Sequence, residues 1–325
     1  MISDSASGRS AAAYAPVRVG LVGAGQWAAT MHAPLHSAGA ETELAGVWSS
    51  RAENSARLAR QHGVPAFASF EELMASCEAV DFAVPPSVQA ELAPQAANAG
   101  LALLLEKPLG ASMAQASAVA EAVRRSGVAN AVVLTKRYHP RTRSFLATAV
   151  ELRSEAPILG VSANYLHGGF LDSGFLNALG RQGWRNEYGP LHDLGPHLLD
   201  LMDLAAGTIE AVRADGTKDY VALTTHHDGG ATGQAAISAS VQLAKVSTTL
   251  SVYSAAGSLD YTTAGMDHSE CWPVLRREFA DAVRLGTPVT ADAERALQVQ
   301  ALVEAAALSA HEQRLVRVAE ILKTA

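Results

Sequence analysis

Two charged side chains follow a short apolar run near residue 105. Glu106 and Lys107 come directly after residues 101–105, all apolar, and Pro108 follows them. If the apolar run is a parallel strand, the pair lies at its carboxyl end, where open α/β sheets hold ligands. Pro108 restricts the backbone of Lys107 and therefore the direction of its ammonium group. Lys107 could orient a substrate hydroxyl and stabilise its alkoxide, whereas an ordinary surface ion pair is the alternative interpretation.

A second group of titratable residues lies between positions 189 and 200. A helix that begins near Leu194 would place His197 and Asp200 on one face, with Asp193 at or near the N-cap. An imidazole suits proton transfer at an alcohol that interconverts with a carbonyl. A capping Asp193 and a packed core His197 remain the alternative. A metal site that adds His192 is a further alternative, although the spacing does not match HExxH.

Residues 23–28 form a glycine loop with the pattern G-x-G-x-x-A between a predicted strand and a predicted helix. Gly23 permits a tight turn, Gly25 lets the backbone approach a diphosphate, and Ala28 lets the helix pack on the sheet. The pattern predicts a dinucleotide site that includes Gln26 and Trp27. A glycine-rich turn without a ligand is the alternative.

The end of the second predicted strand bears on the choice of cofactor. It carries Ser49, Ser50 and Arg51, whereas the nearby acids Glu41 and Glu43 lie at the opposite end of the strand. An acid usually binds the ribose 2′-hydroxyl of NAD, and arginine binds phosphate with paired donors. We therefore expect NADP in preference to NAD. If Arg51 is only a solvated residue, either cofactor would bind.

Composition limits the classes of partner. The 325 residues are 49% hydrophobic and 18% charged, which is typical of a globular chain of about two domains. A net charge of −7 without a basic stripe argues against nucleic acid, and no apolar run approaches the roughly 20 residues of a membrane span. Residues 1–15 resemble a flexible tail and not an export signal. Cys77 and Cys271 form no disulfide or metal pattern, so we expect a cytoplasmic protein.

The first part of the chain alternates short apolar runs with amphipathic segments, which predicts a doubly wound parallel sheet of the Rossmann type for residues 16–137. The predicted strands are 17–22, 44–48, 80–84, 101–105 and 131–134. The predicted helices are 26–37, 51–61, 70–76, 88–98 and 112–125. Four glycines are expected to end helical segments in the left-handed conformation: Gly39, Gly63, Gly100 and Gly127.

Residues 138–325 have a different pattern, which predicts a second, α+β domain with a mostly antiparallel sheet. The predicted strands are 161–166, 209–215, 220–226, 235–243, 247–253 and 258–261. The predicted helices are 141–153, 273–285 and 292–308. Residues 167–190 show no clear period.

The motifs taken together resemble the glucose-fructose oxidoreductase, inositol dehydrogenase and rhizopine catabolism (Gfo/Idh/MocA) family. The resemblance rests on the glycine loop, residues 83–86, residues 106–108, the signature between Gly189 and Asp200, and residues 279–306. It implies a Rossmann domain and a second domain with an open sheet often used for dimerisation, so a homodimer or homotetramer is expected. It also implies nicotinamide-dependent oxidation or reduction of a secondary hydroxyl on a sugar, polyol or cyclitol.

The resemblance also implies roles for single residues. Lys107, Asp193 and His197 match the family's catalytic residues, and Glu106 matches a residue near the nicotinamide ribose. His197 would handle the hydroxyl proton, Lys107 would hold the oxygen, and Asp193 would orient the substrate or His197. Many members have Pro-Asn and a downstream histidine after the third strand. This chain has Pro85-Pro86 and Gln89 instead, which leaves open how the loop at Pro85 packs over the cofactor.

Five further side chains are candidates for the substrate pocket or for ordinary packing: Tyr138, Tyr165, His167, Trp184 and Arg185. Two other functions remain open from the sequence. One is a non-catalytic dinucleotide sensor with the same two domains. The other is a metal-dependent sugar isomerase or hydrolase that uses the cluster from His192 to Asp200.

Overall fold

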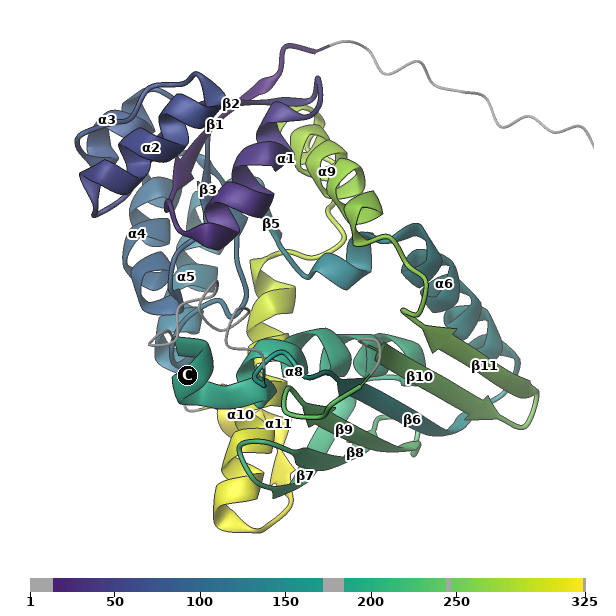
Figure 1. Ribbon diagram of the computed structural model, residues 1–325. Coiled ribbons are helices and arrows are strands. Elements are labelled where there is room, and N and C mark those ends of the chain that lie inside the picture. The colour runs from purple at the N-terminus through teal and green to yellow at the C-terminus, as the bar shows by residue number, and fades with distance from the viewer. Residues whose placement is uncertain (1–13, 172–183, 244–246, 324–325) are drawn as a thin grey trace, which may run out of the picture.

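The computed structural model describes residues 14–171, 184–243 and 247–323, and for residues 184–187 and 247 the backbone alone. The predicted tail lies outside the described residues up to position 13. Figure 1 shows two sheets, one in the upper and one in the lower half of the molecule. None of the described helices is long and apolar enough to span a membrane.

The first sheet has five parallel strands in the order β2-β1-β3-β4-β5. They are β1 (Val17–Val22), β2 (Thr42–Trp48), β3 (Ala79–Phe82), β4 (Ala102–Leu105) and β5 (Asn130–Val132). Every residue of β3 and β4 is buried, as expected for central strands of a sheet covered on both faces. The predicted doubly wound sheet is confirmed. Its strand order reverses between β1 and β3, which places a crevice at their carboxyl ends.

The helical segments of this part are η1 (Ala28–His32, a π-helix), α1 (Ala33–Ser37), α2 (Ala52–His62), α3 (Phe70–Ala75), α4 (Pro86–Asn98), α5 (Met113–Ser126) and η2 (Thr135–Tyr138, a 3₁₀-helix). The Ser112 hydroxyl caps α5 by accepting a hydrogen bond from the Gln115 amide. Gly63, Gly100 and Gly127 have positive φ, as expected. The expectation for Gly39 is wrong, because its φ is not positive and α1 ends at Ser37 with Ala38 still in the right-handed region. Glycine is needed there for space, since the Arg276 guanidinium packs where a side chain would stand.

The second sheet has seven strands in the order β11-β10-β6-β9-β8-β7-β12. They are β6 (Ile158–Leu166), β7 (Ile209–Gly216), β8 (Val221–His227), β9 (Thr232–Ser238), β10 (Ser247–Ser254), β11 (Gly257–Thr262) and β12 (Val316–Arg317). Among the described strand pairs of this second sheet, only β6–β9 is parallel, so the predicted, mostly antiparallel sheet is confirmed. The strand predicted at 235–243 begins earlier and ends at Ser238, because the hairpin with β8 sets its register.

The helices of the second part are α6 (Pro140–Glu155), α8 (Trp184–Ala206), η3 (His268–Glu270, a 3₁₀-helix), α9 (Cys271–Leu285), α10 (Ala293–Glu312) and α11 (Val318–Lys323). Apolar residues of α6, α8 and α10 pack on one face of the seven-stranded sheet. A kink at Gly189 (φ 74°) divides α8. The predicted helix start near Leu194 is wrong, and Asp193 lies inside the helix and not at its N-cap.

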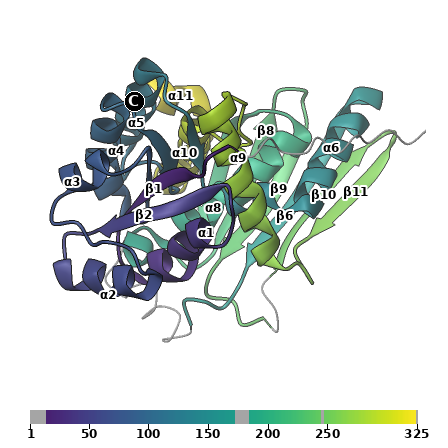
Figure 2. The ribbon, with the colours of Figure 1, turned by 90° about the horizontal axis from the view of Figure 1, so that it is seen from above.

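After the second sheet, α9 returns to the first sheet. Leu275 and Phe279 of α9 pack with Val17 and Val19 of β1, and α1 contributes Leu35 to the same cluster. Helices α4 and α5 cover the opposite face, which Figure 2 shows from above. Because α9 completes the core of the first sheet, that core draws on residues from both ends of the chain. The boundary near Arg137 stays a prediction.

Candidate active site

A first hollow of about 330 Å³ lies at the carboxyl ends of β1, β2 and β3. Its lining includes six of the predicted cofactor contacts: Gly23, Gly25, Ser49, Ser50, Arg51 and Pro85. Trp48 and Asn54 also line it and were not predicted. Sequence patterns find glycine loops more easily than a helix residue such as Asn54, which no motif marks. The hollow lies where the crevice of a doubly wound sheet binds dinucleotides.

The glycine loop fits a bound diphosphate. A side chain at Gly23 (φ 117°) would collide with the Ala83 carbonyl oxygen, so this turn requires glycine. At Gly25 a Cβ would meet no atom within 4 Å, which leaves space above the backbone. Ala28 is fully buried, so the helix packs closely on the sheet. Gln26 is exposed beside this loop.

The end of β2 presents a cation to the same hollow. Arg51 is exposed, and within the described part of the chain its guanidinium forms no ion pair. The Ser49 hydroxyl donates to the Arg51 carbonyl oxygen at 2.9 Å, so its proton is used within the loop and is not available to a ligand. Of the predicted pair of hydroxyls, Ser50 alone is left as a donor toward a ligand. None of the described residues that line this hollow is acidic.

A second cavity of about 580 Å³ lies between the two sheets. It brings together the three predicted catalytic residues, Lys107 after β4 and Asp193 and His197 on α8. Trp27 and Glu106, predicted as cofactor contacts, line this cavity and not the first hollow. Gly23 and Gly25 of the glycine loop therefore line the first hollow, and Trp27 of the same loop lines the cavity.

The ammonium group of Lys107 is tied to α8. Its Nζ lies 2.7 Å from Asp193 Oδ1 and 2.8 Å from the Asp193 carbonyl oxygen. The peptide between Lys107 and Pro108 is cis. Glu106 is fixed separately, because Trp27 Nε1 donates to its Oε1 at 2.7 Å and His32 Nε2 lies 3.3 Å from the same atom. Both charged side chains therefore have defined positions at the cavity wall.

Gln89 fixes the backbone of this segment. It is fully buried, and its side-chain amide donates to the carbonyl oxygens of Glu106 at 2.8 Å and Leu109 at 3.1 Å. Its Oε1 accepts the Glu106 amide proton at 2.8 Å. With a longer contact to the Pro108 carbonyl oxygen at 3.4 Å, the departure from the family pattern at Gln89 thus supplies four hydrogen bonds to the segment that carries Lys107.

His197 is buried at the cavity wall, and its Nδ1 has no hydrogen-bond partner among the described residues. Burial holds the pKa of His197 well below its usual value, and the nearby cations Lys107 and Lys136 lower it further. The ring is therefore neutral near pH 7. A neutral imidazole can accept a proton from a hydroxyl group.

Asp200, three residues after His197, serves another purpose. It is fully buried and binds Arg137 Nη1 at 3.1 Å and Arg295 Nε at 2.8 Å. These ion pairs join α8 to η2 and α10 and so fix the helix that carries His197. His192 Nδ1 lies 3.1 Å from the Tyr188 carbonyl oxygen. No group of three His, Cys, Asp or Glu side chains suited to a metal ion occurs in the described ranges.

The remaining pocket candidates divide between the cavity and the core. Tyr165 and His167 line the cavity, whereas Tyr138 is fully buried and donates to the Val132 carbonyl oxygen at 2.9 Å. The side chains of Trp184 and Arg185 lie outside the described residues. The cavity also contains residues that sequence reasoning missed, namely Met31, Thr135, Lys136, Leu194, His268, Ser269 and Trp272. Lys136 follows the fifth strand much as Lys107 follows the fourth. This similarity in position is the sequence feature that could have marked Lys136 as a cavity residue.

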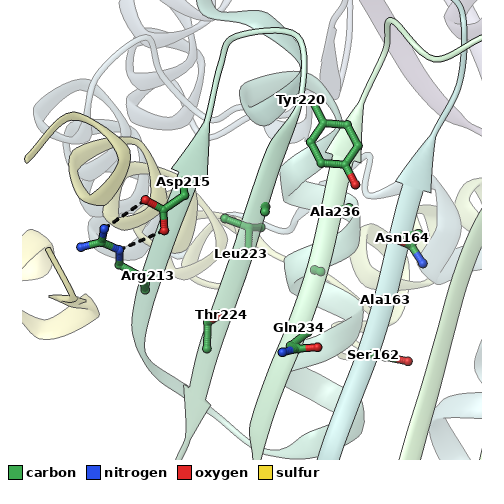
Figure 3. A pocket seen from close by; sticks show the side chains of 12 residues that line it. Ser162, Ala163, Asn164, Arg213, Asp215, Tyr220, Leu223, Thr224, Gln234 and Ala236 are labelled. Carbon is green, nitrogen blue, oxygen red and sulfur yellow. Dashed lines mark hydrogen bonds and ion pairs between the residues drawn. The ribbon is translucent and has the colours of Figure 1, made fainter. Parts of the chain in front are cut away.

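A third hollow, of about 390 Å³, lies on the second sheet and shares no residue with the other two. Figure 3 shows its side chains, which come from β6, β7, β8 and β9 and from Tyr220. Arg213 Nη2 and Asp215 Oδ1 form an ion pair at 3.0 Å there. Assembly of copies of this chain through the sheet stays a prediction.

Comparisons with known proteins agree with this architecture. The family model for the oxidoreductase family with NAD-binding Rossmann fold matches residues 17–134, and the model for the GFO/IDH/MocA C-terminal domain matches residues 158–260. The two sheets, the glycine loop and these matches define the class of protein, a chain of the oxidoreductase family with a NAD-binding Rossmann fold. The chain belongs to the Gfo/Idh/MocA family, as its motifs predicted.

Two curated relatives are similar over part of the chain. It is 32% identical over 124 residues to UDP-N-acetylglucosamine 3-dehydrogenase of Acidithiobacillus ferrooxidans, which covers 38% of this chain and 39% of that protein. It is 33% identical over 129 residues to D-xylose 1-dehydrogenase (NADP(+)) 2 of Haloferax volcanii, with the same 38% and 39% coverage. The matches thus span well under half of either relative.

The fold is similar to solved structures over nearly the whole chain. GenD2 from gentamicin A biosynthesis, solved in complex with NAD, superposes with a TM-score of 0.82 at 23% identity. The superposition covers 94% of this chain and 97% of GenD2. At this identity the likeness establishes the fold.

Proposed function

We propose that this protein is a nicotinamide-dependent dehydrogenase or reductase that acts on a secondary hydroxyl or ketone of a sugar, polyol or cyclitol. The observation that carries the proposal is the convergence of Lys107, Asp193 and His197 on one cavity beside the glycine-loop hollow. Family membership and the sugar dehydrogenases among the relatives support it.

The residues of the two spaces suit a bound dinucleotide. Gly23, Gly25 and the end of β2 would hold its diphosphate and adenosine ribose, and Trp27 and Glu106 would lie near its nicotinamide end. When bound, the nicotinamide ring accepts or donates the hydride at C4. We propose NADP in preference to NAD, because Arg51 lines the hollow and no acid does.

The side chains of the cavity would manage the oxygen and proton of the reacting hydroxyl. Lys107 holds the substrate oxygen and stabilises its negative charge as the C–H bond breaks and the C=O bond forms. His197, kept neutral by burial, takes the hydroxyl proton during oxidation and returns it during reduction. Asp193 positions the ammonium of Lys107 through the 2.7 Å ion pair.

The test is a panel of pyranoses with their uronic acids and phosphates, inositols and polyols, assayed with NADP and with NAD by the absorbance of the reduced nicotinamide. We expect turnover of at least one compound and a loss in kcat of about 10²- to 10⁴-fold in His197→Ala, because a general acid–base is removed. Lys107→Ala is expected to lose turnover to a similar extent.

His226→Ala, at an exposed histidine of β8, is the matched control and should retain wild-type turnover. Cofactor Kd values for His197→Ala close to wild type would show that the fold is intact. Near-wild-type kcat in His197→Ala, or no turnover of any panel member, would contradict the proposal.

A further inference from the structure

Lys136 is a buried cation in the cavity, and none of the described residues is its counter-ion. It lies on η2 and is only 6% exposed. Within the described part of the chain its ammonium forms no ion pair or hydrogen bond, and its recorded contact is the face of the Tyr165 ring, 4.2 Å from the ring centroid. An ammonium group withdrawn from water without a partner anion is costly. Such a group in a ligand cavity points to an anion that arrives with the ligand.

The acidic groups around Lys136 are unable to serve as that anion. Asp193 is paired with Lys107, and Glu106 is held by Trp27 and His32. Burial raises the pKa of the Cys271 thiol to about 11, so it carries no charge at neutral pH. Among the described residues that line the cavity, Lys107 and Lys136 carry ammonium groups, and an acidic side chain pairs with that of Lys107 but not with that of Lys136.

The dinucleotide is not the missing anion. The diphosphate site lies at the carboxyl end of β1, and β3 and β4 separate β1 from β5, the strand that leads into Lys136. Lys136 lines the cavity between the sheets and takes no part in the first hollow. The anion that binds Lys136 must therefore belong to the substrate.

The spacing around Tyr165 suits a single sugar ring. The Tyr165 ring contacts Lys136 on its face, and its centroid lies 6.5 Å from that of the His197 ring. One aromatic ring thus separates the group that would accept a proton from the unpaired cation. A monosaccharide can place a reacting hydroxyl at one of these points and an acidic substituent at the other.

We infer that the substrate is an acidic monosaccharide whose carboxylate or phosphate binds the Lys136 ammonium while its reacting hydroxyl lies between Lys107 and His197. This inference rests on the proposed dehydrogenase function and adds the substrate class. Carboxylate and phosphate share the chemistry that an ammonium recognises, a compact oxygen anion.

The test uses matched probes that differ in charge. The pairs are D-glucuronate with D-glucose, D-galacturonate with D-galactose, and D-glucose 6-phosphate with D-glucose. The first two pairs report on a carboxylate and the third on a phosphate. We expect wild type to prefer at least one acid over its neutral partner by about tenfold or more in kcat/KM, as one charge-assisted contact allows.

Lys136→Met should lower kcat/KM for that acid by roughly 10- to 100-fold, mainly through KM, and so reduce the preference. Lys136→Arg, which keeps the charge, should restore most of it. Lys323→Met, at an exposed lysine of α11, is the control and should leave the preference unchanged. The inference is overturned if the kcat/KM of wild type for neutral sugars equals that for the acids. It is also overturned if the preference for the acid is unchanged in Lys136→Met.

Two measurements are independent of turnover. Calorimetry should give a Kd for the preferred acid that rises at least about tenfold in Lys136→Met. The ligand-free Lys136→Met protein should have a Tm equal to or above that of wild type, because an unpaired buried charge is removed. A sharply lower Tm, or no binding of any of the three acids to wild type, counts against the inference.

These arms separate the two proposals. If no probe is oxidised but an acid binds in a Lys136-dependent manner, the dehydrogenase proposal fails and the anion subsite stands. If neutral sugars are oxidised without regard to charge, the dehydrogenase proposal stands and the acidic-substrate inference fails.

Discussion

Single side chains determine where the reacting groups of the cavity stand. The side chain of Lys107 takes its direction from Asp193 at 2.7 Å, and four hydrogen bonds of Gln89 hold the backbone around it. Gln89 touches neither the first hollow nor the cavity. It is therefore a positioning residue, and its effect on turnover must pass through the segment 106–109.

Replacing Gln89 tests this positioning role. Gln89→Leu keeps the size of the side chain but leaves the Glu106 amide and three carbonyl oxygens without this partner. We expect the free energy of unfolding to fall by about 2 kcal/mol or more, since each buried unpaired group costs about 1–3 kcal/mol. We also expect kcat to fall about tenfold, a size typical of small misplacement of a reacting group.

Gln95→Leu, at an exposed position of the same helix, is the control and should change neither quantity. Chemical denaturation and steady-state kinetics measure the two effects. A normal kcat in a destabilised Gln89→Leu protein would assign Gln89 to stability alone.

Arg51 carries the cofactor prediction at the residue scale. Arg51→Ala should raise the Kd of NADP by about tenfold or more and leave that of NAD nearly unchanged, because a charged hydrogen bond is worth about 1.5–3 kcal/mol. Arg57→Ala, at an exposed position of α2, the helix that begins directly after Arg51, is the matched control. Fluorescence titration with both cofactors gives the Kd values. An unchanged NADP preference in Arg51→Ala would remove Arg51 from the argument.

At the scale of elements, a buried charge network joins η1 and α1 to β3 and to the cavity wall. Asp81 of β3 is fully buried and lies 2.9 Å from ring nitrogens of both His32 and His36. Burial alone would lower the pKa of His32, but Asp81 and Glu106 raise it to about 10. Burial alone would raise the pKa of Asp81, but His32 and His36 lower it to about 2. His32 is thus charged at neutral pH and links β3 to Glu106.

These shifts predict how stability depends on pH. The raised pKa of His32 gives a contribution that is complete below its ordinary pKa of 6.5 and is lost as the pH rises toward about 10. The lowered pKa of Asp81 gives a contribution that is complete above 3.8 and is lost as the pH falls toward about 2. The ion pair therefore stabilises the fold most between these two ordinary values.

Asp81→Asn should lower the free energy of unfolding by about 3–5 kcal/mol near pH 6, because it leaves a buried ion pair without one partner. The difference from wild type should shrink as the pH rises from 6.5 to 10. Urea denaturation across this range measures it, with the exposed Glu151→Gln as control. A difference that grows with pH would show that His32 is not the charged partner.

For the molecule as a whole, the cofactor sheet depends on the last part of the chain. Cys271, Leu275 and Phe279 of α9 are fully buried against strands of the first sheet, and Arg276 binds Glu41 beside β2 at 2.8 Å. The same return sets η3 and Trp272 at the cavity. A change in α9 should therefore reach the nucleotide-binding sheet, far away in sequence.

Phe279→Ala tests this dependence. We expect a loss of about 3–5 kcal/mol in stability, as for other buried aromatic residues. Hydrogen exchange should show faster exchange at the amides of β1 and β5, which α9 covers. Leu285→Ala, at a residue 63% exposed on the same helix, should leave exchange unchanged. Unchanged exchange in β1 for Phe279→Ala would show that the sheet is stable without the α9 contact.

The sequence by itself determined the elements and the kinds of chemistry, because both are written in local order. Alternation and spacing located β1 at residues 17–22, the glycine loop and the two-sheet architecture, all of which the fold confirms. Residue type pointed to Lys107 and His197, which stay predictions until assayed. Two of the departures in the fold depend on contacts between distant segments, namely the packing of Arg276 at Gly39 and the pairing that sets the end of β9. The departure at Asp193 follows from the kink at Gly189.

Only the tertiary structure decided which side chains meet. Lys107 and Asp193 pair across 86 residues, and Arg295 reaches Asp200 across 95. Lys136 has no ion-pair partner among the residues that the structure describes, because the neighbouring acids bind other groups. Periodicity carries information about the next turn or strand but none about contacts between distant segments. The burial of the cavity residues, their ion pairs and the lowered pKa of His197 therefore follow only from the tertiary structure, in which the two sheets and α9 enclose the cavity.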